Sequence, residues 1–487
     1  MSPKSSSERA ASFGLWITPV VFVAVLLAPT SLPAPAHRLA AVFAAVVILW
    51  VTEAIPLAMT ALLGPAVAVV LGVEDATEVF ASFGHPVLFL FLGSFMIARA
   101  MSLHGLDRRI ALFVLSRPVV GDRPDRILFA FGAIAMLLSM WLSNTATTAM
   151  MLPIGMGVLS ALPVERQGAT AGWATGLMLM IAYATAVGGV ATPIGTPPNL
   201  IAIGMIEQLA GRRISFFEWM RFAVPISLAM FGALYLIVRA MYPAPTESFA
   251  GASRAIREQR AQLGPWSAGE RATLASFCLA VALWTLPGIA TALLGADDPR
   301  SVALGKVLPE AVGAILAAGL LFVIPVDRSE HKFALGWSEA VRIDWGTVLL
   351  FGGGLALGTL AFSTGLAKEL GGGALAAAGE LPRWAYVLAA VLIGVVLTEF
   401  MSNTAIASLL VPMFLAVGGA GAGDPVLAAI AATLGCSLAF CLPVSTPPNA
   451  IVYGSGYVPL AAMIRTGVGL DLVCSLITWA ALMLLVP

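Results

Sequence analysis

Apolar residues along this chain gather into long stretches, which polar and charged residues separate. The stretches recur from one end to the other, and most of them hold about 16 to 25 residues. A helix of that length crosses roughly 30 Å of hydrocarbon, at about 1.5 Å per residue. The pattern predicts an all-α polytopic membrane protein with about 11 transmembrane helices. The predicted spans are 14–29, 39–53, 56–73, 85–103, 169–209, 217–241, 272–295, 303–325, 344–366, 425–463 and 465–486.

Two further apolar stretches, 126–161 and 383–419, carry polar residues at their middle. The first contains WLSNTATTAMMLP (141–153) and the second contains FMSNTAIASLLVP (400–412). Ser, Asn and Thr are helix-capping residues, so each stretch divides into two half-length helices that meet at a polar tip. We interpret both stretches as re-entrant hairpins.

Spans 169–209 and 425–463 are too long for one straight crossing, and each contains a proline-rich break. The breaks read ATPIGTPPN (191–199) and LPVSTPPN (442–449). Proline cannot continue a helix from behind, but it suits the first turn of a new helix. Both spans are therefore predicted to be discontinuous helices.

The motifs occur in the same order in both halves of the chain, which predicts an internal repeat. Ser143 recurs as Ser402, 259 positions later, and Thr196 recurs as Thr446, 250 positions later. Each half holds five spans and one hairpin, and a hairpin returns to its starting side, so the second half runs inverted. We divide the chain into the N-terminus with the first span (1–38), a first repeat (39–242), a cytoplasmic linker (243–271) and a second, inverted repeat (272–487).

Composition supports a membrane protein and argues against other classes. Hydrophobic residues make up 59% of the chain, charged residues make up 11%, and the formal net charge is zero. Basic residues are dispersed, so no nucleic-acid partner is expected. Their bias places the N-terminus in the cytoplasm and the C-terminus outside the cell (inner) membrane. No arrangement of nucleophile, base and oxyanion donors is visible, so the protein is not expected to be an enzyme.

Four breaks within lipid imply one composite site, because freed backbone is tolerated there only where it is buried or lines a cavity. At each break one half-helix ends in free carbonyls, which attract cations, and the next begins with free N–H groups, which attract anions. A helix N-terminus contributes about 0.3–1 kcal/mol to a nearby anion, whereas desolvating each charge costs several kcal/mol. None of the four motifs contains Lys or Arg, so bound cations are expected to supply the missing attraction for a dianion.

Sodium is the predicted cation, because carbonyl and hydroxyl oxygens suit a hard cation and intramembrane carboxylates, the usual proton relays, are scarce. Glu399, beside the second tip, is the exception. It either carries a proton or has a structural hydrogen-bonding role.

At these residues the chain resembles the divalent anion:sodium symporter family, which includes bacterial dicarboxylate carriers and mammalian citrate and sulfate carriers. The resemblance rests on SNTA (143–146 and 402–405), TPPN (196–199 and 446–449) and WVTEAIPL (50–57), and it extends over nearly the whole chain. It implies a bacterial di- or tricarboxylate transporter. Such a transporter is a homodimer in the lipid bilayer, with scaffold domains and transport domains that move as an elevator.

The resemblance also implies which residues bind. A first sodium site would use Ser139, Ser143, Asn144 and the backbone of Gly195. A second would use Thr398, Asn403 and the backbone of Met401 and Ser445. The substrate carboxylates would meet residues of both tips and both breaks: Ser143, Asn144, Thr145, Thr196, Ser402, Asn403, Thr404, Thr446 and Pro447.

Thr ends both triplets, which within the family is more typical of di- and tricarboxylate carriers than of sulfate carriers. We therefore expect sodium-coupled uptake of C4-dicarboxylates, with succinate, malate or fumarate as the leading candidates. Two alternatives stay open. One is a sodium-independent dicarboxylate exchanger of the same fold, and the more remote one is an anion channel, which would need a continuous pore lining.

Overall fold

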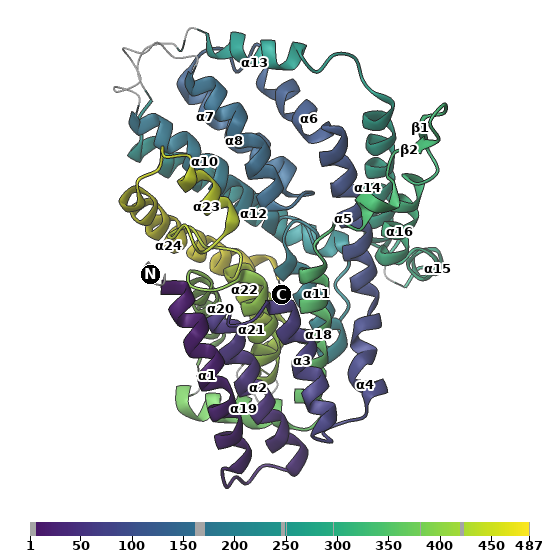
Figure 1. Ribbon diagram of the computed structural model, residues 1–487, viewed down its shortest axis with the longest axis vertical. Helices are drawn as coiled ribbons and strands as arrows, with labels where there is room; N and C mark the ends of the chain where they lie inside the picture. The colour runs from purple at the N-terminus through teal and green to yellow at the C-terminus, as the bar shows by residue number, and fades with distance from the viewer. Residues whose placement is uncertain are drawn as a thin grey trace.

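The structure is a computed structural model, and it describes residues 6–160, 171–244, 249, 251–295, 297–379, 381–418 and 423–486. The last residues of both predicted hairpins (161 and 419) and part of the predicted linker (245–248 and 250) lie outside the described residues. Helices dominate the molecule (Figure 1), which confirms the all-α prediction with one small exception. The exception is an antiparallel hairpin of β1 (Pro325–Asp327) and β2 (Lys332–Phe333).

Helix ends in the first half follow local sequence signals. Asp75 accepts hydrogen bonds from the first turn of α4, proline occupies the first turn of α5, α7 and α11, and Ser215 caps α12. The helices are α1 (Ser6–Leu27), α2 (Ala34–Thr52), α3 (Leu57–Val70), α4 (Ala76–Ala81), the 3₁₀-helix η1 (Ser82–Gly84), α5 (Pro86–His104), α6 (Leu106–Leu115), α7 (Pro124–Ser139), α8 (Asn144–Ser160), α10 (Ala171–Val190), α11 (Pro197–Ala210) and α12 (Phe216–Met241).

The second half uses the same kinds of signal. Ser267 and Glu270 form a capping box at α14, Asp424 caps α22 and Thr446 caps α23. The helices are α13 (Ala252–Ala261), α14 (Ala268–Leu294), α15 (Pro299–Val307), α16 (Glu310–Leu320), α17 (Trp337–Ala340), α18 (Trp345–Ser363), α19 (Leu366–Ala378), α20 (Arg383–Thr398), α21 (Asn403–Val417), α22 (Pro425–Gly435), α23 (Pro447–Gly454) and α24 (Leu460–Leu485).

Eight helical segments of the described chain are long and apolar enough to cross a membrane. The eleven predicted spans correspond to these eight, the bent pair α15–α16, the short α3 and the broken pair α22–α23. Predicted span 303–325 is not straight, because its two helices meet at 52° beside Pro309, which has no N–H to continue the first helix. Predicted span 425–463 is also too long, since α23 ends at Gly454 and a new helix starts at Leu460.

Two amphipathic helices, α6 and α19, follow α5 and α18 where the sequence predicted only the end of a span. Each follows a glycine in the left-handed region, Gly105 at φ +69° and Gly365 at φ +81°. Such a glycine ends one helix and lets the chain turn into the next. The two helices therefore lie at matching places in the two halves of the chain.

The interior of the molecule centres on the upstream halves of the two broken spans. Every residue of α10 from Trp173 to Val190 is buried, and α22 is buried from Val426 to Gly435. Both helices are rich in Ala and Gly, which lets neighbouring backbones approach closely. The hairpin α7–α8 packs on α10 in the upper part of Figure 1, and α20–α21 packs on α22 in the lower part.

Candidate binding site

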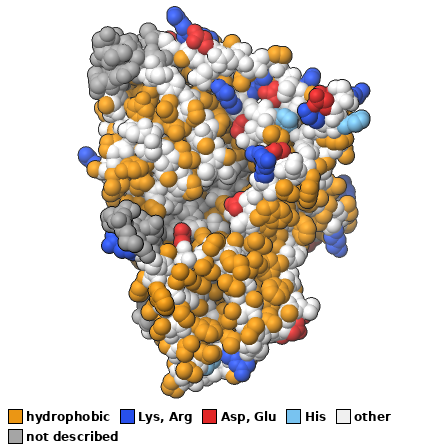
Figure 2. Space-filling view, viewed as in Figure 1, with side chains coloured by type: hydrophobic (Ala, Val, Ile, Leu, Met, Phe, Trp, Pro, Cys, Tyr) orange, Lys and Arg blue, Asp and Glu red, His pale blue; other side chains and the backbone are white. Residues whose placement is uncertain are grey.

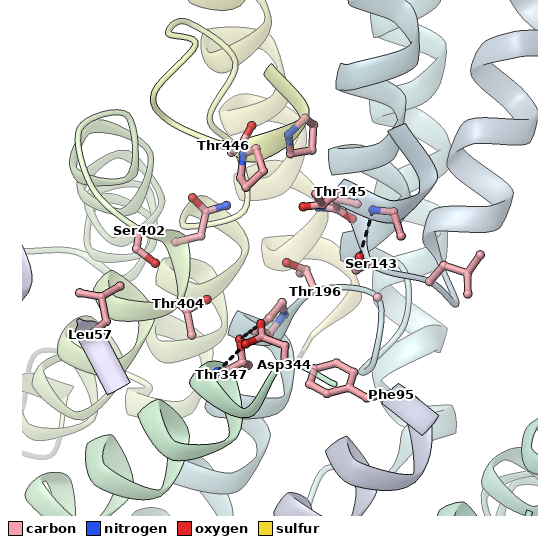
Figure 3. A pocket seen from close by; sticks show the side chains of 18 of the residues that line it. Leu57, Phe95, Ser143, Thr145, Thr196, Asp344, Thr347, Ser402, Thr404 and Thr446 are labelled. Carbon is pink, nitrogen blue, oxygen red and sulfur yellow. Dashed lines mark hydrogen bonds between the residues drawn. The ribbon is translucent and has the colours of Figure 1, made fainter. Parts of the chain in front are cut away.

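A cavity of about 1180 Å³ lies where the two hairpin tips and the two proline-rich breaks meet. Figure 2 shows the molecule hollowed at mid-height on this face. In Figure 3 the side chains of Ser143 and Thr145 face the cavity from one side, and those of Ser402, Thr404 and Thr446 face it from the other. Segments that are about 250 residues apart in the sequence therefore share one space.

All nine residues that the resemblance implied for the substrate line this cavity, from Ser143, Asn144, Thr145 and Thr196 in the first repeat to Ser402, Asn403, Thr404, Thr446 and Pro447 in the second. Gly195, Met401 and Ser445, from the sodium sets, also line it. Ser139 and Thr398 do not, because they are fully buried behind the tips. The structure thus gathers the predicted residues, and their individual roles remain proposals.

The two tips have the same internal hydrogen bond. Ser139 Oγ donates to Asn144 Oδ1 at 2.7 Å, and Thr398 Oγ1 donates to Asn403 Oδ1 at 2.6 Å. Each bond joins the last residue of the upstream half-helix to the first residue of the downstream half-helix. It fixes the orientation of the Asn side chain. An oriented amide oxygen beside a hydroxyl is a suitable ligand pair for a hard cation.

Backbone carbonyls converge beside the first tip, where close approach requires glycine. A methyl group on Gly189 would lie 2.5 Å from Asn144 Oδ1, and one on Gly195 would lie 2.6 Å from the Gly189 carbonyl oxygen. The Ser139 carbonyl oxygen would be 3.0 Å from that same methyl group. The carbonyl oxygens of Gly189 and Ser139 thus lie close to Gly195, and the amide oxygen of Asn144 lies close to Gly189.

The second tip is built differently at one point. Ser445 Oγ donates to the Glu399 backbone carbonyl at 3.0 Å, and it lies 2.6 Å from Glu399 Oε2. In the first repeat the matching carbonyl, that of Met140, is bonded by the hydroxyl of Thr192. Ser445 aligns with Gly195, and not with Thr192, at the offset of 250. The hydroxyl that binds the equivalent carbonyl therefore comes from a different position in each repeat.

Sequence reasoning gave no role to the asparagines of the two TPPN breaks, and the structure shows one. Asn199 Nδ2 donates to the carbonyl oxygens of Gly189 at 3.0 Å and Thr192 at 2.8 Å. Asn449 Nδ2 donates to Ala439 at 3.1 Å and Leu442 at 3.0 Å, the equivalent carbonyls 250 positions later. Each Asn closes its own break. The equal spacing of the two breaks was the available signal.

Charged groups also line the cavity, outside the four motifs. Arg99 and Arg342 do so, and Glu339 forms an ion pair with each of them. The prediction of a site without Lys or Arg therefore holds for the motifs but not for the whole cavity. The wall still carries more carboxylates than guanidinium groups, because Glu53, Asp107 and Asp344 line it too. Burial raises the pKa of the Asp107 carboxyl above its ordinary value.

Comparison with known proteins identifies the family. The family model described as the sodium:sulfate symporter transmembrane region matches residues 9–485. The chain belongs to this family. The predicted membership of the divalent anion:sodium symporters is thereby confirmed.

Similar proteins include members of this family with a stated substrate class. The sodium-dependent dicarboxylate transporter SdcS of Staphylococcus saprophyticus is 33% identical over 484 residues, which cover 97% of this chain and 91% of that protein. SdcS of Staphylococcus aureus (strain bovine RF122) is 33% identical over 474 residues, covering 95% and 89%. The crystal structure of the Alcanivorax borkumensis YdaH transporter matches 98% of both chains with a TM-score of 0.58 and 16% identity, which supports the predicted fold.

Proposed function

We propose that this protein takes up C4-dicarboxylates, such as succinate, malate or fumarate, together with sodium ions. The observation that carries the proposal is the single cavity shared by both Ser-Asn-Thr tips and both TPPN breaks. The dicarboxylate transporters that resemble this chain support the substrate class. In this proposal Asn144 and Asn403 each serve an ion and the substrate.

The geometry supports binding of cations before the dianion. Oxygen atoms of the tips and breaks would hold one sodium ion near Ser139 and Gly195 and another near Thr398 and Ser445. A sodium ion about 4 Å from a carboxylate attracts it by about 4 kcal/mol at an effective dielectric near 20. The cavity wall carries more acidic than basic groups, so co-bound cations provide the attraction that the wall lacks.

Larger-scale features of the proposal come from family resemblance. They are a homodimer, an elevator movement of the transport domain, a cytoplasmic N-terminus and an extracellular or periplasmic C-terminus. Light scattering of the purified protein checks the first, because a dimer has twice the 50.4 kDa mass of the chain.

Uptake by proteoliposomes tests the function. With an inward sodium gradient, we expect accumulation of radiolabelled succinate, malate or fumarate to exceed that of citrate and sulfate, and removal of the gradient to abolish it. Uptake that ignores sodium but is stimulated by internal dicarboxylate would instead identify an exchanger. Saturating single-channel currents without sodium would identify an anion channel.

Variants of the tips test the site. Asn144→Ala and Asn403→Ala each remove the amide at one tip, so each is expected to abolish sodium-driven uptake. Both residues are only half-buried at the cavity surface, so the variants should insert and purify like the unaltered protein. Size-exclusion profiles provide the folding control. Full uptake by both variants would contradict the proposed site.

A further inference from the structure

Two carboxylates meet in the interior of the second repeat, behind the tip and apart from the cavity wall. Glu399 ends α20 and Asp471 lies in α24, and each side chain is only 7% exposed. One oxygen of each and Cys441 Sγ lie within 4.8 Å of one another. Within the described part of the chain, neither carboxylate forms an ion pair with Lys, Arg or His.

The hydrogen bonds around the pair leave one oxygen free. Glu399 Oε1 accepts from the Cys441 backbone N–H at 2.9 Å, and Glu399 Oε2 lies 2.6 Å from Ser445 Oγ. Asp471 Oδ2 accepts from Cys441 Sγ at 2.9 Å. Asp471 Oδ1 is buried and has no partner among the described residues. A buried, unpaired carboxylate oxygen beside a second carboxylate is strongly unfavourable unless a proton or a metal cation neutralises the pair.

The backbone is shaped to bring Asp471 to this place. One turn earlier in α24, a methyl group on Gly467 would lie 2.5 Å from the Phe440 carbonyl oxygen and 2.6 Å from Cys441 Cα. Glycine at this position lets α24 contact the break directly. Asp471 therefore reaches Cys441, just before the break, which also binds Glu399.

The first repeat has no equivalent of this pair. Glu399 aligns with Met140 at the offset of 259. Asp471 is the twelfth residue of α24, and the twelfth residue of α12 is Ser227, which donates to the Val187 carbonyl at 2.6 Å. The repeat thus folds with uncharged groups at both positions. Structural need alone does not account for two acids in the second repeat.

We propose that Glu399 and Asp471 together bind a sodium ion, in addition to the two ions held at the tips. Oxygen ligands bind hard cations of this size at about 2.3–2.6 Å, so atoms within 4.8 Å of one another can surround one such ion. Ser445, which lines the cavity and lies 2.6 Å from Glu399 Oε2, separates the site from the cavity. This inference rests on the proposed sodium coupling and adds a third, asymmetric ion to it.

Counting bound sodium tests the inference without any substrate. Radiolabelled sodium is titrated onto the purified protein and onto Asp471→Asn, which keeps the side-chain size but removes the charge. We expect the variant to bind one sodium ion fewer per chain. Glu399→Gln gives an independent second variant if Asp471→Asn purifies poorly. Asp424→Asn is the matched control, since it removes a carboxylate from the same repeat while Asn still caps α22.

A second measurement counts the charge that accompanies transport. In proteoliposomes at set membrane potentials, Asp471→Asn should move one positive charge fewer per dicarboxylate than the unaltered protein. An unchanged sodium count in both variants would overturn the inference. A second result would also overturn it. The unaltered protein would show the infrared C=O band of a protonated carboxyl group, and Asp471→Asn would remove that band without changing the number of sodium ions bound. If sodium drives no dicarboxylate uptake, the proposed function fails, and the ion count still decides the third site.

Discussion

At the scale of single residues, the two asparagines of each repeat have different surroundings. Asn144 lies half-buried at the cavity, with its Oδ1 held by Ser139. Asn199 is fully buried and donates its amide hydrogens to carbonyls of its own break. The first is placed to contact ligands, and the second holds the loop that presents them. Changes at the two positions should therefore differ in kind.

Asn199→Ala is expected to destabilise the protein. It leaves the carbonyls of Gly189 and Thr192 without their side-chain donor, and a buried polar group without a partner costs about 1–3 kcal/mol. Thermal unfolding of the detergent-purified variant should begin at a lower temperature. Asn144→Ala, measured alongside, should lose less stability, because the one hydroxyl that it leaves without a partner, that of Ser139, can donate instead to the carbonyl one helical turn earlier. Equal loss of stability in both would contradict the distinction.

Sequence alone predicted much of the site at residue scale but missed its interior. The family resemblance implied Ser139 and Thr398, which each lie four residues before their triplets, and the structure places both beside the tips. Asp471 carried no local signal, because one acid within an apolar span says nothing about what it contacts. Its partner Glu399 is 72 positions away, and only the folded chain brings the two together.

At the scale of elements, α10 holds the first hairpin in place through backbone contact. A methyl group on Gly188 would lie 2.2 Å from the Met136 carbonyl oxygen and 2.8 Å from Met136 Cα. Both atoms belong to the last turn of α7, which ends at Ser139. Because backbone cannot move aside as a side chain can, this contact sets the distance between the hairpin and the broken span.

Gly188→Ala should force α7 away from α10 and disturb the first sodium site. Overpacking of this kind typically costs about 1–3 kcal/mol, and we expect a lower unfolding temperature and weaker sodium dependence of uptake. Gly232→Ala in α12 is the matched control, because a methyl group there meets nothing within 4 Å. The control should leave stability unchanged or slightly raised. Unchanged uptake and an unchanged unfolding temperature in Gly188→Ala would argue against the contact between Gly188 and Met136.

Element prediction succeeded where the chain has strong local signals and failed where geometry depends on neighbours. The triplets and TPPN motifs located all four breaks, since capping residues and prolines end helices wherever they occur. The bend of α15–α16 was missed because apolar residues continue on both sides of Lys306, Pro309 and Glu310, so that the stretch was taken as one span. Helices α6 and α19 were missed because each directly follows a membrane span. In the sequence they resemble either the end of that span or a loop.

At the scale of the whole molecule, the two repeats are joined by specific bonds as well as by the shared cavity. Tyr183, fully buried in α10, donates to the Phe440 carbonyl at 2.7 Å and lies 3.3 Å from that of Met463. Phe440 precedes the break of the second repeat, so a helix of the first repeat contacts the segment that leads into the proposed second ion site. Loosening either half is therefore expected to affect the other.

Tyr183→Phe tests this connection. Removal of one buried hydroxyl should cost about 0.5–1.5 kcal/mol and raise the sodium concentration needed for half-maximal uptake, because the second break is less firmly held. Tyr235→Phe is a suitable control, since the Tyr235 ring packs on Phe129 and its hydroxyl bonds to nothing within the described ranges. A sodium dependence unchanged in Tyr183→Phe would show that the repeats act separately.

In the two breaks, hydroxyl groups at different positions bind equivalent backbone carbonyls. Thr192 serves the carbonyl of Met140, whereas Ser445 serves that of Glu399 from the position where the first repeat has Gly195. Ser445→Gly alone would leave the Glu399 carbonyl oxygen without its hydroxyl donor. Gly195→Ser alone would add a hydroxyl beside the Met140 carbonyl, which Thr192 already binds. The two halves are therefore not interchangeable at these positions. A protein rebuilt from two copies of either half would need both positions altered at once.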